Sequence, residues 1–320
     1  MILIISDEND NSTNDVIDWL LFYNAEFIRI HPDHQVAIRA LSIEEDGAAN
    51  FELHCNEQKI SYAQITSVWY RRGRLKLELE YSRLADTIEG LDMATKDEIH
   101  VLTDFIHYLL SLKPHISNFL SRKVNKLQCL FIARQCGLSI PPSYLFTRKE
   151  QLRTLHARPT ALINKPLGEV FDLKFKRRLY ITMTEEITAS LVANAPDAFL
   201  PSLFQHKIKK FVELRIFFLF DDFYPMAIFS QTDAQTAVDF RNYNYQKPNR
   251  NVPVELPAGL TEKLKRFTKE VKLNCGSIDM IVTPEDDYVF LEVNPVGQYG
   301  MVGFPCNYQL DKKIAEFLIQ

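Results

Sequence analysis

The chain has 320 residues, of which 46% are hydrophobic and 24% are charged, so it is long enough to build two or three domains with apolar cores. A formal net charge of −4 argues against a nucleic-acid-binding protein, because such proteins carry a broad basic surface. The five cysteines form no CxxC pair, and no signal peptide or long apolar stretch is present, so we expect no disulfide framework, no zinc site, no membrane partner and a cytoplasmic location.

The first part of the chain, residues 1–115, has the pattern of an open α/β domain. Short apolar runs alternate with segments whose apolar residues recur at helical spacing, which predicts a β-α-β opening. The predicted elements are a strand at 1–6, a helix at 12–23 capped by Ser12, Thr13 or Asn14, a strand at 26–30, an ambiguous polar stretch at 40–66 that suits a hairpin, a strand at 67–73 and an amphipathic helix at 97–112. KPHISN at 113–118 interrupts the pattern, so we place a domain boundary there.

The middle part, residues 116–200, alternates helical and strand patterns. The predicted elements are helices at 125–138, 148–156 and 185–195 and strands at 143–146, 161–165 and 179–182. Between the last two strands lies the basic stretch GEVFDLKFKRR, which is either a lid over phosphates or a solvated loop.

The last part, residues 201–320, is rich in strands. The predicted elements are strands at 202–208, 212–220, 224–231, 277–282 and 288–293, a loop at 233–251 and helices at 261–274 and 309–319. The short acidic turn TPEDD joins the last two strands, which indicates a hairpin.

Oxygen ligands gather on this predicted hairpin. Glu292 and Asn294 point to the same face of one strand, because side chains alternate along a strand. Asp279 lies on the strand before it, close enough in a hairpin to share an ion with them. Mg²⁺ binds such oxygens together with substrate phosphates. An isolated pattern of this kind is more often an ordinary polar hairpin, so the interpretation needs phosphate-binding partners.

Candidate partners for phosphate are spread along the chain. Lys126 begins a predicted helix, Lys165 ends a strand before a proline, Arg215 lies in VELRIFF and Arg241 lies in the loop DFRNYN. Each of these cations alone is most often a solvated surface charge. No Walker A, GxGxxG, GxSxG or HExxH motif is present, which leaves a nucleotide site of strand lysines and an oxygen-bound metal.

The ordered segments resemble the ATP-grasp superfamily. They are NKLQCLFIARQCGLSIP, LINKP, FQHKIKKFVELR, SIDMIV and FLEVNPVGQYG. Over essentially the whole chain the sequence is similar, more narrowly, to the ATP-grasp peptide maturases that make graspetides, of the microviridin type and the grasp-with-spasm branch. SVWYRRG, VDFR and NPVGQYG carry this narrower resemblance.

The resemblance implies an α/β ATP-grasp fold and a ligase. An N-terminal pre-ATP-grasp domain at 1–115 would precede a central lobe at 116–200 and a C-terminal lobe with the metal site at 201–320, and the two lobes would clamp ATP. The cofactors would be ATP and Mg²⁺ or Mn²⁺, and the substrate a ribosomal precursor peptide with a leader segment. Its Asp or Glu carboxylates would become acyl phosphates and then esters or amides with Ser, Thr or Lys side chains. A homodimer is left open.

The resemblance also assigns roles to residues. Lys126 and Lys165 would bind the ATP phosphates, and the adenine hinge would be formed by Gln205, His206 and Lys207. Arg215 and Arg241 would stabilise the transferring phosphate, and Mg²⁺ would be held by Asp279, Glu292 and Asn294. The peptide would be bound by Arg71, Arg72 and Asp239. For Arg71 and Arg72 a solvated strand end is an equal alternative.

Two other functions remain open from the sequence. One is a ligase that adds a free amino acid to a peptide, protein or small carboxylate. The other is a nucleotide-binding module without catalysis, which has no need of the cations Arg215 and Arg241.

Overall fold

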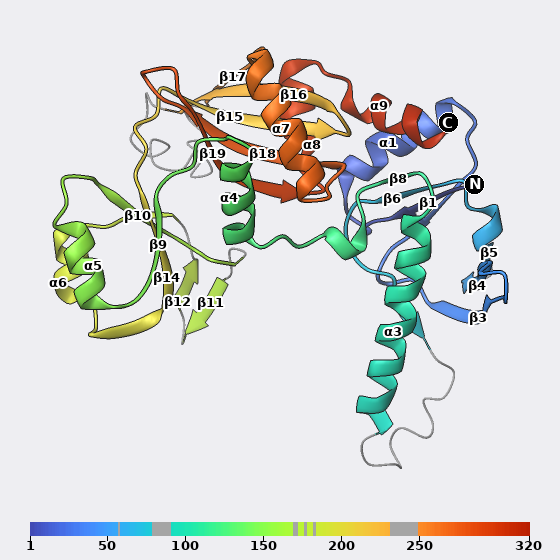
Figure 1. The fold of residues 1–320 in the computed structure, drawn as a ribbon. Coiled ribbons are helices and arrows are strands. Elements are labelled where there is room, and N and C mark those ends of the chain that lie inside the picture. Colours follow the sequence, from blue (N-terminus) through green and yellow to red (C-terminus); the bar gives the residue numbers. More distant parts are fainter. Residues whose placement is uncertain (57, 79–90, 169–171, 176–177, 182–183, 231–248) are drawn as a thin grey trace. The chain divides into compact units, whose positions relative to one another are not determined.

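A computed structural model describes the chain except residues 57, 79–90, 169–171, 176–177, 182–183 and 231–248 (Figure 1). The described residues divide into two compact units. The first comprises Met1–Lys123, Leu273–Gly276 and Pro295–Gln320, and the second comprises Val124–Lys272 and Ser277–Asn294. The three-part division predicted from the sequence stays a prediction.

A parallel sheet in the order β2-β1-β6-β8 lies in the first unit (Figure 1). Its strands are β1 (Ile2–Ile5), β2 (Phe27–Ile30), β6 (Ser67–Tyr70) and β8 (His115–Ile116). β1 pairs in parallel with both β2 and β6, and every residue of β1 and β6 is buried. Strands of a buried parallel sheet form continuous apolar runs, which is why the sequence identifies them.

Helix α1 (Asn11–Phe22) connects β1 to β2. Its N-cap is Asp10, whose carboxylate accepts a hydrogen bond from the Ser12 backbone N–H at 3.1 Å. The predicted caps Ser12, Thr13 and Asn14 are therefore wrong. A carboxylate suits this position because it also faces the positive end of the helix dipole.

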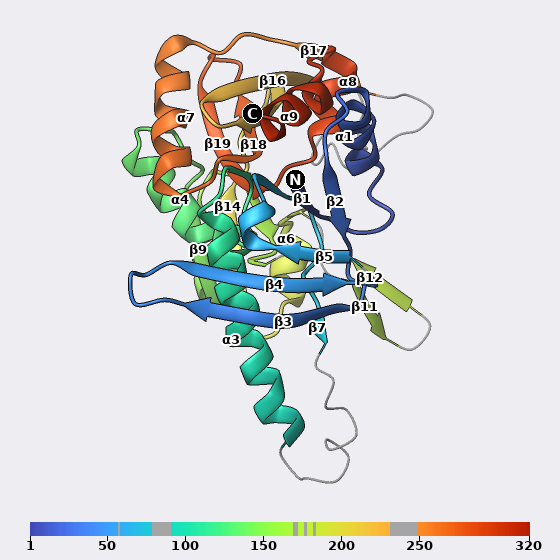
Figure 2. The ribbon, with the colours of Figure 1, turned by 90° about the vertical axis from the view of Figure 1, so that its right-hand side faces the viewer.

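A second sheet of the first unit has the order β5-β4-β3-β7. Its strands are β3 (Val36–Ile43), β4 (Ala49–Cys55), β5 (Gln58–Ser61) and β7 (Leu77–Glu78). β3 and β4 form an antiparallel hairpin (Figure 2), which confirms the hairpin suggested for the polar stretch. The predicted long helix is α3 (Leu91–Ser111), and two short 3₁₀ helices are η1 (Tyr62–Gln64) and η2 (Phe119–Ser121).

The C-terminal helices α8 (Tyr299–Cys306) and α9 (Leu310–Leu318) belong to the first unit. α9 confirms the helix predicted at 309–319. It packs on α1, where the Trp19 indole donates a hydrogen bond to Asp311 Oδ2 at 2.7 Å. Helix α8 was not expected from its sequence.

The second unit contains a sheet in the order β13-β10-β14-β9. Its strands are β9 (Ser143–Arg148), β10 (Leu162–Lys165), β13 (Glu185–Glu186) and β14 (Ala198–His206), and its helices are α4 (Lys126–Gln135), α5 (Lys149–His156) and α6 (Ala189–Asn194). The helix predicted at 185–195 is thus a short strand followed by α6. Part of the predicted basic loop is also a strand, because β11 (Asp172–Phe175) pairs with β12 (Arg178–Ile181).

A further sheet of the second unit has the order β17-β16-β15-β18-β19. Its strands are β15 (Val212–Leu219), β16 (Asp222–Phe229), β17 (Arg250–Pro253), β18 (Cys275–Val282) and β19 (Tyr288–Pro295), with helix α7 (Ala258–Glu270). Two of these strands reach the boundary of the unit, because the first two residues of β18 and the last residue of β19 belong to the first unit. β15 is buried along its whole length. The strand order places β15 and β19 on either side of β18.

Among the helices in the described part of the chain, none combines the length and the apolar character that crossing a membrane requires.

Candidate active site

Neighbouring strands β18 and β19 bring two of the predicted metal ligands together. The Asn294 side-chain amide donates a hydrogen bond to Asp279 Oδ2 at 3.1 Å. Glu292 lies two residues before Asn294 on β19, so it shares the same face of the sheet. The three oxygen-bearing side chains that the sequence grouped therefore belong to one face of two adjacent strands.

Arg215 joins this group from β15, on the other side of β18. Its Nη1 lies 2.6 Å from Asp279 Oδ1 and 2.7 Å from Oδ2, and only 7% of the residue is exposed. A charged pair this short and this well buried is stronger than a surface ion pair and fixes both side chains. The Arg215 Nε is buried and has no hydrogen-bond partner within the part of the chain that the structure describes. Arg215 therefore has an unsatisfied donor beside the predicted metal ligands.

Lys126 pairs with the remaining carboxylate. Its Nζ lies 3.6 Å from Glu292 Oε2 and 3.4 Å from the Pro166 carbonyl oxygen. Lys126 is the first residue of α4, whose N-cap Asn125 accepts from two backbone N–H groups of the first turn. Pro166 directly follows Lys165, the last residue of β10. The start of α4, the end of β10 and the face of β19 that carries Glu292 thus meet.

The predicted hinge residues lie at the end of β14. Gln205 is 2% exposed and its amide donates to Ser143 Oγ at 2.8 Å, so its side chain is used within the sheet. His206 Nε2 is buried and has no hydrogen-bond partner among the described residues. Lys207 Nζ lies 2.5 Å from Glu186 Oε2 on β13. The FQHKI segment has no acidic residue, and the fold supplies one at the hinge from another strand.

Arg71 does not occupy the exposed position that peptide docking would need. It is 3% exposed, and its guanidinium Nη1 donates to the Gly297 carbonyl at 2.5 Å. Its Nε donates to Ser12 Oγ at 3.1 Å and lies 3.1 Å from Asp10 Oδ2. Burial lowers the pKa of Arg71, and Asp10 opposes that shift. Both predictions for Arg71, peptide docking and a solvated strand end, are corrected, because burial gives it internal partners.

Arg72 has the opposite placement. Its side chain is 45% exposed and lies 3.7 Å from Asp10 Oδ2, so it remains available to a partner. The two other residues of this group, Asp239 and Arg241, lie outside the described residues, and their roles stay predictions.

The donor set fits Mg²⁺. Asp279, Glu292 and Asn294 offer oxygen ligands only, which is the chemistry that Mg²⁺ selects. Arg215 and Lys126 offset the negative charges of the two carboxylates. A positively charged metal would therefore bind this site together with a negatively charged phosphate. Within the described ranges no group of three or more His, Cys, Asp and Glu side chains forms a metal cluster, and this set contains only two carboxylates plus an amide.

Comparisons with known proteins found chains of similar fold. Residues 1–113 match the family described as the MvdD pre-ATP grasp domain. The structure matches a Chryseobacterium gregarium RiPP-associated ATP-grasp ligase in complex with ADP and a leader and core peptide, with a TM-score of 0.79 and 23% identity over 99% of this chain and 96% of that one. It also matches macrocyclase MdnC bound with precursor peptide MdnA from Microcystis aeruginosa MRC, with a TM-score of 0.76 and 26% identity over 99% of both chains. The chain has an ATP-grasp fold.

A third solved structure is similar to this chain. It is ATP-grasp ligase PsnB complexed with minimal precursor, Mg and ADP, with a TM-score of 0.71 and 18% identity over 99% of this chain and 96% of that one. No curated protein matches the chain. The resemblance to ATP-grasp maturases of RiPPs that the sequence motifs carry is confirmed, and so is the ATP-grasp fold.

A buried triad in the second unit was not predicted from the sequence. Lys210 Nζ contacts Glu213 Oε1, and Ser230 Oγ donates to the same oxygen at 2.7 Å. All three side chains lie near one end of β15, the strand that carries Arg215. The spacing of Lys210 and Glu213 in KKFVELR was the available signal, although Ser230 is distant in sequence.

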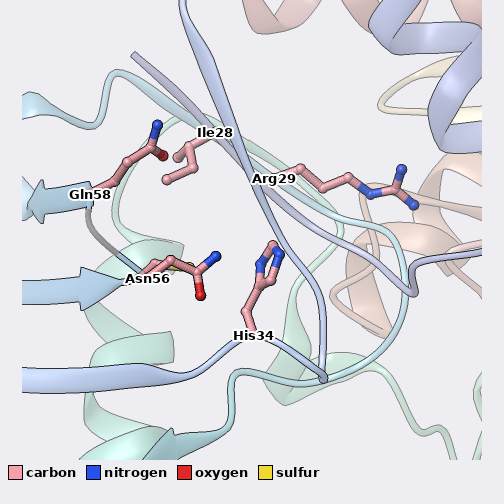
Figure 3. Close-up of a pocket in the computed structure, with 6 residues that line it drawn as sticks. Ile28, Arg29, His34, Asn56 and Gln58 are labelled. Carbon is pink, nitrogen blue, oxygen red and sulfur yellow. The ribbon is translucent and has the colours of Figure 1, made fainter.

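One pocket among the described residues contains none of the predicted site residues. It has a volume of about 470 Å³ and is lined by Ile28, Arg29, His34, Cys55, Asn56 and Gln58. Figure 3 shows the Arg29 side chain extending away from the other labelled residues, and its Nε donates to Ser6 Oγ at 2.7 Å. Besides Arg29, the polar side chains that line the pocket are therefore the amides of Asn56 and Gln58 and the imidazole of His34.

Proposed function

We propose that this chain is an ATP- and Mg²⁺-dependent ligase that joins side chains within a ribosomal precursor peptide. Its Asp or Glu carboxylates would be activated as acyl phosphates and then joined to Ser, Thr or Lys side chains as ω-esters or ω-amides. The observation that carries the proposal is the contact of Arg215 with Asp279 and of Asp279 with Asn294. This cluster lies within an ATP-grasp fold, and the similar solved structures hold ADP and precursor peptides.

The first step is phosphoryl transfer. A carboxylate oxygen of the peptide attacks the γ-phosphorus of ATP, the bond to the β-phosphate oxygen breaks, and ADP leaves. Mg²⁺ held by Asp279, Glu292 and Asn294 would offset the charge of the phosphate oxygens. Arg215 reaches the same group from β15 and would stabilise the charge of the transferring phosphoryl group.

Two lysines would hold the phosphates in this reaction. Lys126 begins α4, so its amine acts beside the positive end of that helix. Lys165 ends β10, directly before Pro166, whose carbonyl oxygen contacts Lys126. The paired placement supports a common phosphate site for both amines. Gln205, His206 and Lys207 would place the adenine at the end of β14, with Gln205 acting through its backbone.

The second step forms the ester or amide. A hydroxyl or amine of the same peptide attacks the acyl carbon, the carbon–oxygen bond to phosphate breaks, and inorganic phosphate and a proton are released. Carboxylate oxygen is a poor leaving group and phosphate is a better one, and holding both partners in one peptide removes the entropic cost of their encounter. The net change in the peptide is the loss of one water for each bond.

We propose that Arg72 and Asp239 bind the peptide and that Arg241 helps Arg215 to stabilise the transferring phosphate. Arg72 is exposed beside Asp10, so it could pair with acidic residues of the substrate. We further propose that the ligase acts in the cytoplasm, where all five of its buried thiols would stay reduced.

Intact-mass spectrometry tests the proposal. The protein is incubated with ATP, Mg²⁺ and a candidate precursor peptide encoded beside its gene. We expect ADP release and a peptide lighter by about 18 Da for each bond, because each condensation removes one water. A heavier peptide would mean that a free amino acid is added instead. If the protein binds nucleotide but releases no ADP in the presence of any candidate peptide, the catalytic proposal is contradicted.

A further inference from the structure

The strand that carries two proposed metal ligands ends in an unusual turn. Directly after β19, Val296 has φ +67° and Gly297 has φ +66°. Glycine adopts this left-handed conformation readily, but a β-branched residue rarely does, because its Cβ crowds the backbone. Strained residues of this kind persist only where surrounding contacts hold them, and they gather at functional sites.

Both carbonyl groups of this turn are held by buried side chains. The Val296 carbonyl oxygen accepts from Cys275 Sγ at 3.4 Å, and the Gly297 carbonyl oxygen accepts from Arg71 Nη1 at 2.5 Å. Arg71 is the stronger of the two holders, because its donor is charged and only 3% of the residue is exposed.

Arg71 is itself fixed by the start of α1. Its Nε contacts Ser12 Oγ and the Asp10 carboxylate, each at 3.1 Å. Its guanidinium lies over the Tyr299 ring, 5.6 Å from the centroid, and the Tyr299 hydroxyl donates to the Ser12 carbonyl. A planar, multiply anchored guanidinium has little freedom, so it holds the Gly297 carbonyl at one position.

We propose that Arg71 is a positioning residue that holds the Val296–Gly297 turn and thereby sets Glu292 and Asn294 for metal binding. The turn begins only two residues after Asn294, so a change of backbone conformation there would rotate the end of β19. Such a rotation would move the Asn294 amide away from its 3.1 Å contact with Asp279. This inference rests on the proposed function, because it takes these side chains as metal ligands.

Metal binding tests the proposal without relying on turnover. Free Mn²⁺ is measured by electron paramagnetic resonance during titration of the protein in the presence of ADP. We expect Arg71→Met to raise the Mn²⁺ dissociation constant by about tenfold or more, because loss of supporting contacts around ligands weakens metal sites by this amount. Arg71→Lys keeps the charge beside Asp10 but cannot reach every acceptor, so we expect an intermediate value.

Arg39→Met provides the matched control, because Arg39 is an exposed residue of β3. It should bind Mn²⁺ as the unaltered protein does. The folded fraction of each variant is measured by circular dichroism, and a purely structural role of Arg71 would lower that fraction without changing the dissociation constant of the folded protein. Arg71→Lys keeps the test valid if Arg71→Met does not fold.

The outcomes separate the two proposals. If the unaltered protein binds no Mn²⁺ with ADP, the proposed metal site fails. If the unaltered protein binds Mn²⁺ and folded Arg71→Met and Arg71→Lys bind it equally well, the metal site stands and the positioning role of Arg71 is refuted.

Discussion

Replacing Arg215 with methionine should damage both the stability and the chemistry of the candidate site. The Arg215 Nη1 lies 2.6 and 2.7 Å from the two oxygens of Asp279, and their side chains are only 8% and 15% exposed. Arg215→Met leaves the Asp279 charge buried without this partner, and breaking a buried pair from one side costs about 3–5 kcal/mol. An arginine that stabilises a transferring phosphoryl group contributes a factor of about 10³–10⁵ in rate, so ADP formation should fall by about that much.

A second variant separates these two effects. Arg215→Met combined with Asp279→Asn removes both charges, so much of the lost stability should return, whereas activity should not. Unfolding in urea is followed by far-ultraviolet circular dichroism, because both tryptophans, Trp19 and Trp69, lie in the first unit and do not report on the second. ADP release is measured at saturating ATP, Mg²⁺ and peptide. Fully folded Arg215→Met with activity within about tenfold of the unaltered protein would refute the catalytic role.

Three further predictions concern other parts of the chain. Lys165→Ala should abolish peptide modification while the circular dichroism spectrum is retained, and retained modification would remove Lys165 from the phosphate site. Burial raises the pKa of the Cys275 thiol to about 12, so iodoacetamide at pH 8 should alkylate Cys275 only after unfolding in urea. Peptide mass spectrometry measures the alkylation, and alkylation of the folded protein would contradict the burial of this thiol. Burial, aided by Arg122, lowers the pKa of His107 to about 3, so the unfolded state takes up a proton below pH 6.5 that the folded state does not. Stability should therefore fall from pH 7 to pH 5, and His107→Phe should reduce that loss by about 2 kcal/mol in urea unfolding; an equal loss in the variant would contradict this.

The sequence predicts the parts of the fold that depend on local patterns. The apolar runs of β1, β6 and β15 are continuous, and such runs indicate buried strands whatever their neighbours are. The proximity of Asp279 and Asn294 is predictable from the sequence, because a short turn joins β18 to β19 and side chains alternate between the two faces of a strand.

Helix α8 shows where local patterns fail. It contains Gly300, Gly303 and Pro305, which are poor helix formers, so no helix is predicted there from the sequence. Packing favours the helix instead, because α8 lies against α9 and buries Val302 and Cys306.

Arg71 shows a second kind of failure. Three arginines in RRGR predict a solvated or ligand-binding strand end, and its neighbour Arg72 is indeed exposed. The buried guanidinium of Arg71 donates a hydrogen bond to the carbonyl of Gly297, which is 226 residues away in sequence. No local rule identifies such a partner, so the role of Arg71 depends on the tertiary structure.

The central claim is that a peptide carboxylate is activated by phosphoryl transfer from ATP. The most direct test uses a precursor peptide whose Asp and Glu side-chain carboxylates carry oxygen-18. If the carboxylate oxygen attacks the γ-phosphorus and later leaves with phosphate, one labelled oxygen should appear in the inorganic phosphate for each bond formed. Label in AMP, or unlabelled phosphate accompanying bond formation, would contradict the acyl phosphate pathway.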